Sequence, residues 1–214
     1  FLQDLERRFG RDVFDAFLRR WFDEHAFKSV TTDDFLAFLR RELLAKQPGK
    51  LSEAELAAWI AGPGIPDFAV PATSSRLKAV DAAREDWLKR RTAAVDLDTD
   101  EWITQEWVHF LEGLPADIAA ERLIELDSAL RFTGTSNGEI AERWYPITVR
   151  AGYFEARPAL GQFLRQVGRR KLILPSYVAL AETPEGLAFA RQVFQQASAF
   201  YHPITRASVQ AALD

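Results

Sequence analysis

One short basic stretch stands out among the residues whose types and spacing could do chemistry. Gly168 is followed by three adjacent cations, Arg169, Arg170 and Lys171, and then by an apolar run that ends at Pro175. An arginine offers a planar fork that fits a carboxylate, and a lysine adds a compact positive charge. Composition alone allows two interpretations of this stretch, a solvated basic loop or a grip for an anion.

The pattern around these cations predicts a bend between two helices. A glycine that follows a helical pattern is typical of a helix end, so Gly168 marks the end of one helix. A proline is common at the first position of a helix, so Pro175 marks the start of the next. We therefore expect the cations to point away from the chain, where they can meet a partner.

The remaining candidates for catalysis are isolated from one another. His25, His109 and His202 have no second histidine within four residues, so no H-E-x-x-H zinc helix is present. We interpret His25 as a helix cap or surface residue, His109 as partly buried and hydrogen-bonded, and His202 as a turn residue. The chain also lacks cysteine, a G-x-S-x-G motif and a glycine-rich phosphate loop. The residues alone predict no catalytic site and no metal site within this chain.

Charge and hydropathy exclude several classes of protein. The 214 residues carry a net charge of -4, which argues against a general nucleic-acid binder. The chain has no long apolar run, so we expect no segment to span a membrane. Acids dominate residues 96–127, whereas bases lead in residues 150–191. This separation leaves Arg169 without nearby acids in the sequence and favours a partner outside the chain.

Apolar residues recur with helical spacing along almost the whole chain, and alternating strand patterns are nearly absent. Ser52 with Glu55, and Ser136 with Glu139, have the spacing of capping boxes that begin helices. Several further helix starts carry a proline near the first turn. The sequence therefore predicts an all-α fold, a stack of antiparallel helices similar to a short α-solenoid.

A proline- and glycine-rich stretch offers the clearest domain boundary. Residues 62–66 and Pro71 forbid regular structure, and they separate a short helical region from a longer one. The chain contains no methionine and begins inside a helical pattern. We therefore expect it to be a piece of a longer protein.

Four stretches, taken in order along the chain, resemble one family. They are Phe27-Lys28-Ser29-Val30-Thr31-Thr32-Asp33-Asp34-Phe35, Pro63-Gly64-Ile65-Pro66, Asn137-Gly138-Glu139-Ile140 with Arg143-Trp144, and Gly168-Arg169-Arg170-Lys171 with Pro175 and His202-Pro203. Together they are similar to the C-terminal third of the leukotriene A4 hydrolase-type M1 zinc aminopeptidases. The resemblance runs the length of the chain.

The resemblance implies a division of the chain. Residues 1–46 would be the last helices of a thermolysin-like catalytic domain, residues 47–72 a Pro/Gly linker, and residues 73–214 a C-terminal helical domain. That domain would be an α-α superhelix, a HEAT/armadillo-like helical stack. In such enzymes the zinc ligands and the catalytic groups lie upstream of Phe1. The resemblance thus implies zinc in the full-length parent, none in this chain, and no activity of this chain alone.

The resemblance also implies a role for the basic stretch. In this family an arginine of a Gly-Arg-x-Lys turn reaches the catalytic cleft and binds the free carboxylate of the substrate, with the lysine nearby. Residue by residue, these roles fall on Arg169 and Lys171. Arg170 stands where a family representative has an apolar residue, and this extra charge leaves the orientation of the turn open.

The expected function is that of the C-terminal part of a zinc aminopeptidase that removes N-terminal residues from short peptides. This part would wall the cleft and bind the substrate carboxylate. Its partners would be a short peptide, through the parent enzyme, and the catalytic domain of the same chain, with no nucleic acid and no membrane.

Two other functions stay open at this point. Stacked helices offer extended concave surfaces, so the chain could instead be a helical scaffold that binds protein partners. Epoxide hydrolysis of a lipid is a further activity within the family, and no residue of this chain signals it. The compartment is open as well, with a cytoplasmic protein favoured over a secreted one.

Overall fold

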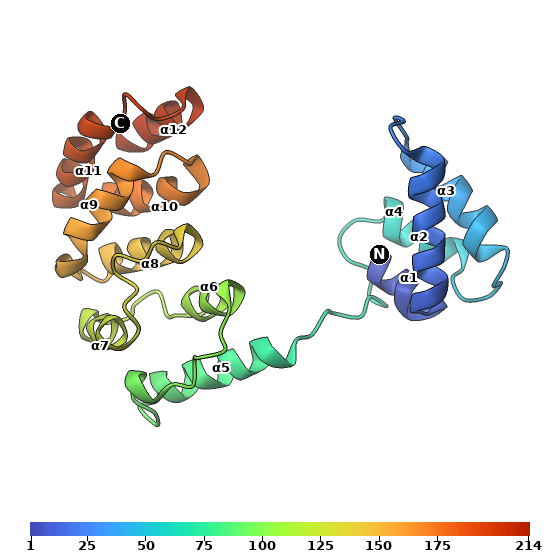
Figure 1. Cartoon of the computed structure of the whole chain (residues 1–214), viewed down its shortest axis with the longest axis horizontal. Helices are drawn as coiled ribbons and strands as arrows, with labels where there is room; N and C mark the ends of the chain where they lie inside the picture. The colour runs from blue at the N-terminus through green and yellow to red at the C-terminus, as the bar shows by residue number, and fades with distance from the viewer. The chain divides into compact units, whose positions relative to one another are not determined.

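The structure, a computed structural model, describes residues 1–214 and is helical throughout. It holds twelve α-helices and no strand (Figure 1), which confirms the all-α prediction. The chain divides into two compact units, Phe1–Thr73 and Ser74–Asp214, each with its own apolar core. None of the helices combines the length and the hydropathy that crossing a bilayer requires.

The first unit holds four α-helices around a small aromatic core. They are α1 (Leu2–Phe9), α2 (Arg11–His25), α3 (Thr32–Leu39) and α4 (Glu53–Ala61), with a π-helical turn, η1 (Arg40–Leu44), directly after α3. The rings of Phe17, Trp21 and Phe38 pack against one another in this core. The buried side chain of Leu56 joins the same core and ties α4 to it.

Side-chain caps fix where two of these helices begin. The Ser52 hydroxyl accepts a hydrogen bond from the Glu55 N–H (3.2 Å), and the Glu55 carboxylate accepts one from the Ser52 N–H (2.9 Å). The predicted capping box is therefore confirmed. The Ser52 N–H, followed by Arg8, lowers the pKa of Glu55 to about 2. Thr31 and Asp34 form the same reciprocal pair at the start of α3.

The second unit stacks its helices in two layers. In one layer α6 (Thr104–Glu112), α8 (Gly138–Arg150), α10 (Arg170–Ala181) and α12 (Pro203–Leu213) follow one another, each packed against the next (Figure 1). In the other, α9 (Arg157–Gln166) packs against α11 (Pro184–Ala197). The remaining helices are α5 (Ser75–Leu88), which packs on α6, and α7 (Ala120–Leu130). Two short 3-10 turns, η2 (Ala94–Asp96) and η3 (Phe154–Ala156), connect these elements.

Large aromatic side chains fill the core of the second unit, and their polar atoms are satisfied. Trp87 and Trp144 are fully buried. Their indole N–H groups donate to a Glu125 carboxylate oxygen (3.1 Å) and to the Thr133 hydroxyl (2.9 Å). A buried indole N–H without a hydrogen-bond acceptor would lower the stability of the fold. These two hydrogen bonds therefore allow the large rings to be buried without that penalty.

The start of α10 differs from the sequence prediction. The helix begins at Arg170, and Pro175 lies inside it instead of opening it. A proline at this depth removes one hydrogen bond, the one that its missing N–H would donate to the Lys171 carbonyl. Burial of Ile173 and Tyr177 on the same helix offsets that loss, because both side chains are fully covered by the core. Core packing therefore outweighs the local preference of proline for the first turn of a helix.

The start of α8 also differs. Asn137 is the cap residue, and its side-chain oxygen accepts from the Glu139 N–H (3.0 Å). The predicted capping box from Ser136 to Glu139 is therefore wrong. The Glu139 carboxylate is turned instead toward α10, where it meets a cation.

Candidate functional site

The three cations lie at the first turn of α10, and all three are exposed. Arg169 is the cap residue, and Arg170 and Lys171 are the first two residues of the helix. The N-terminus of a helix carries a partial positive charge from its unpaired N–H groups, and acidic residues normally occupy it. The first turn of α10 has none. Positive charge therefore accumulates here, and the arrangement favours a bound anion.

The cations differ in how they are paired within the chain. Lys171 Nζ donates to Glu139 Oε2 and lies 3.8 Å from Glu142. Arg170 Nε donates to the Ser208 hydroxyl (2.8 Å). Arg169 caps the helix without a side-chain cap bond, and it forms none of the ion pairs of this helix start. Its guanidinium is the free group of the three.

Glu139 is the acid that the sequence did not connect to the basic stretch. Lys171, its hydrogen-bond partner, lowers the pKa of the Glu139 carboxyl. The contact depends on a close approach of two helix starts, because a Cβ on Gly138 would lie 2.9 Å from Leu172 Cδ1. A side chain at position 138 would require the Leu172 side chain to shift. The Asn137-Gly138-Glu139 run was visible in the sequence, but no local pattern predicts which distant helix it contacts.

A buried tyrosine pair holds the turn that precedes Arg169. The Tyr201 hydroxyl donates to the Leu164 carbonyl in the last turn of α9, and it lies 3.0 Å from the Tyr177 hydroxyl. The Tyr201 ring also packs beside Gly168, since a Cβ at that glycine would meet Tyr201 Cδ1 at 3.6 Å. Burial raises the pKa of both tyrosines. These contacts of Tyr201 anchor the turn before Arg169 to the core.

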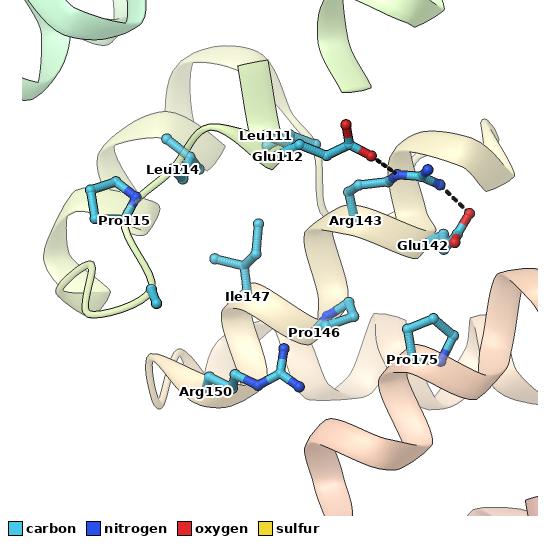
Figure 2. A pocket seen from close by; sticks show the side chains of 11 residues that line it. Leu111, Glu112, Leu114, Pro115, Glu142, Arg143, Pro146, Ile147, Arg150 and Pro175 are labelled. Carbon is cyan, nitrogen blue, oxygen red and sulfur yellow. Dashed lines mark hydrogen bonds and ion pairs between the residues drawn. The ribbon is translucent and has the colours of Figure 1, made fainter. Parts of the chain in front are cut away.

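A pocket of about 370 Å³ opens beside the basic stretch, between α6, α8 and α10 (Figure 2). We call it the proline pocket, because Pro146 of α8 and Pro175 of α10 both line it inside their helices. Its full lining is Leu111, Glu112, Leu114, Pro115, Ala116, Glu142, Arg143, Pro146, Ile147, Arg150 and Pro175. The helical periodicity of the sequence did not predict this pocket. The only feature of the sequence that pointed to it was the presence of prolines within helical patterns.

The three histidines lie apart, as expected from their spacing. His109 Nε2 is 2.8 Å from Asp81 Oδ1, and His109 is partly buried, which confirms that interpretation. His25 stacks on Trp21 at the end of α2. His202 accepts from the Ile204 N–H and caps α12. No group of three His, Cys, Asp or Glu side chains comes together in a way that could hold a metal ion.

Comparison with known proteins gives the family. The family model described as leukotriene A4 hydrolase, C-terminal, matches residues 102–213, more than half of the chain. The chain is 29% identical to leucine aminopeptidase 2 of Pyricularia oryzae over 96% of its own length. It is 30% identical to leucine aminopeptidase 2 of Eremothecium gossypii over 99% of its own length. It spans 34% and 37% of the lengths of these two relatives.

A solved structure has the same fold. The structure of yeast LTA4 hydrolase in complex with bestatin superimposes on 98% of this chain and 37% of its own, with a TM-score of 0.76 and 24% sequence identity. The fold match covers almost the whole chain, and the family model covers its second half. The chain therefore belongs to the family of the leukotriene A4 hydrolase C-terminal domain.

Proposed function

We propose that this chain is the C-terminal part of a zinc-dependent aminopeptidase that removes N-terminal residues from short peptides. Arg169 and Lys171 would bind the free carboxylate of the peptide. The names of the relatives, leucine aminopeptidase 2, support the reaction class. The observation that carries the residue assignment is the exposed, unpaired guanidinium of Arg169 at the positive end of α10.

The resemblance assigns the other parts of the enzyme to other regions. Residues 1–46 would complete a thermolysin-like catalytic domain, residues 47–72 would link it, and residues 73–214 would form an α-α superhelix. Zinc would activate the water that attacks the peptide bond, and its ligands would lie before Phe1. No three metal-binding side chains meet within this chain.

Each group at the start of α10 would contribute to carboxylate binding in its own way. The planar fork of Arg169 can hold both carboxylate oxygens at once. The unpaired N–H groups of the first helical turn add donors that point the same way. Lys171 already holds Glu139, so it would either exchange that partner for the substrate or support the charge from a distance. Holding the far end of a short peptide orients its N-terminus for cleavage.

The test is a substrate comparison in the intact parent enzyme. Arg169→Ala should lower kcat/KM for a tripeptide by about 10- to 150-fold, the effect of losing a hydrogen bond to a charged group. It should leave kcat/KM nearly unchanged for an aminoacyl p-nitroanilide, which has no carboxylate. Arg170→Ala is the matched control, because Arg170 is bonded to Ser208 and should affect neither substrate strongly.

Two results would contradict the proposal. Equal losses on both substrates would mean that Arg169 supports the structure and does not bind the carboxylate. No loss on either substrate would favour the alternative function, a helical module that binds protein partners.

A further inference from the structure

Lys171, one of the two residues assigned to the substrate carboxylate, is already held by acids of α8. Its Nζ donates to Glu139 Oε2 and lies 3.8 Å from Glu142 Oε2. The Glu139 side chain and the end of a peptide present the same chemical group, a carboxylate, to this lysine. A lysine ammonium is one point charge on a flexible stem, so a second carboxylate competes with the first for it.

The backbone of Glu139 is fixed beside the start of α10. Asn137 accepts from the Glu139 N–H (3.0 Å), and its amide donates to the hydroxyl of the first residue of α6 (2.9 Å). Gly138 lies against α10, because a Cβ there would stand 2.9 Å from Leu172 Cδ1. The Lys171 side chain, in contrast, is about half exposed. An exchange of partners therefore moves the lysine side chain and leaves the start of α8 in place.

Arg143 offers Glu139 a second cation. Arg143 Nη1 lies 3.4 Å from Glu139 Oε2, and the two residues are four apart on one face of α8. Arg143 also binds Glu142 and Glu112 Oε1 (3.0 Å), as the dashed lines in Figure 2 show. Glu139 therefore keeps a positive partner when Lys171 leaves it, which lowers the cost of the exchange.

The charges of this cluster explain why Lys171 is occupied. Three acids of α6 and α8 share two cations in it. One negative charge is in excess, so Lys171 stays with Glu139 when no other carboxylate is present. Arg169 forms none of these ion pairs. The two cations thus differ, since Arg169 is ready to bind and Lys171 has to be taken from Glu139.

We propose that Glu139 regulates the carboxylate site by occupying Lys171 until a substrate carboxylate takes its place. The lysine then turns from Glu139 to the substrate, and Glu139 remains paired with Arg143. This inference rests on the proposed function, because it needs a substrate carboxylate at Arg169 and Lys171. Glu139 itself does not touch the substrate. Its effect is to raise KM for substrates that use Lys171 and to leave substrates without a carboxylate unaffected.

The test is the kinetics of Glu139→Gln in the intact parent enzyme, a change that removes the competing charge and keeps the side chain's size. KM for a tripeptide should fall about 1.5- to 5-fold at unchanged kcat, the fold-change that corresponds to an exposed ion pair. Turnover of an aminoacyl p-nitroanilide should stay unchanged, and it also reports that the variant is folded. Glu155→Gln removes an equal charge at an exposed position outside the cluster, and this matched control should change neither substrate.

A second variant separates competition for Lys171 from a general change of charge. In a Lys171→Met background, Glu139→Gln should give no gain on the tripeptide, because no lysine remains to be released. A gain of the same size in that background would overturn the proposal, as would an unchanged or raised tripeptide KM in the single variant. If Arg169→Ala still lowers kcat/KM for the tripeptide alone, such a result rejects the role of Glu139 and leaves the proposed function standing. Equal losses of Arg169→Ala on both substrates reject both.

Discussion

Replacing Tyr201 with phenylalanine should destabilise the second unit more than the loss of one oxygen atom suggests. The Tyr201 hydroxyl is the donor to the Leu164 carbonyl, and its partner on the other side is the Tyr177 hydroxyl. Leu164 lies in the last turn of α9, where a helix leaves its carbonyls without partners. Tyr201 therefore caps this helix end from 37 residues away.

The magnitude follows from the burial of all three groups. Tyr201, Tyr177 and Leu164 are each at most 3% exposed, so water cannot replace the missing hydroxyl. An unsatisfied buried polar group costs about 1–3 kcal/mol. Tyr201→Phe leaves both the Leu164 carbonyl and the Tyr177 hydroxyl without a partner. We therefore expect the free energy of unfolding to fall by about 2–6 kcal/mol, the cost of two such groups.

The assay is urea unfolding read by hydrogen exchange in peptides from α8 to α11, which separates the second unit from the first. Tyr177→Phe is the matched control, because it keeps the bond from Tyr201 to Leu164 and should cost less. The double variant should be no less stable than Tyr201→Phe, because the stranded Tyr177 hydroxyl is gone. Equal single losses that add in the double variant would refute the capping argument.

Three further outcomes are expected. Ser52→Ala removes a helix cap and should lower the urea midpoint of the first unit, with a loss of about 1 kcal/mol. Burial and the bond to Asp127 raise the pKa of Tyr153 to about 12. The stability that Tyr153 contributes is therefore present below pH 10 and lost as pH rises toward 12; Tyr153→Phe should flatten this alkaline loss in pH-dependent unfolding. Gly138→Ala should shift the NMR signals of Leu172 in α10, since its Cβ would lie 2.9 Å from Leu172 Cδ1.

Local signals in the sequence predicted much of the fold. The capping box at Ser52 and the prolines that open α11 and α12 lie where the pattern put them. The prediction failed where packing competes with local preference. Pro175 lies inside α10 because the buried side chains around it hold the helix together despite the missing bond. Asn137, and not Ser136 as expected, caps α8, because its side-chain oxygen accepts the hydrogen bond from the Glu139 N–H (3.0 Å).

The candidate site was predictable only in part. That Arg169 and Lys171 lie two residues apart is a property of the sequence, and both are exposed at the start of α10. The pairing of Lys171 with Glu139 could not be predicted from the sequence, because the two residues are 32 positions apart and meet only where two helix starts contact each other. Gly138 lies against Leu172 of α10 at this contact, and nothing in the sequence around Gly138 identifies α10 as its neighbour.

The cations at the start of α10 set a conflict between folding and binding. A sequence chosen for stability alone would place aspartate or serine there, so these residues make the helix start locally frustrated. Under the proposed function, a bound carboxylate would relieve this conflict and stabilise the domain through mass action. Directed selection for heat resistance would therefore replace Arg169 and Arg170 early, at the expense of the proposed carboxylate binding.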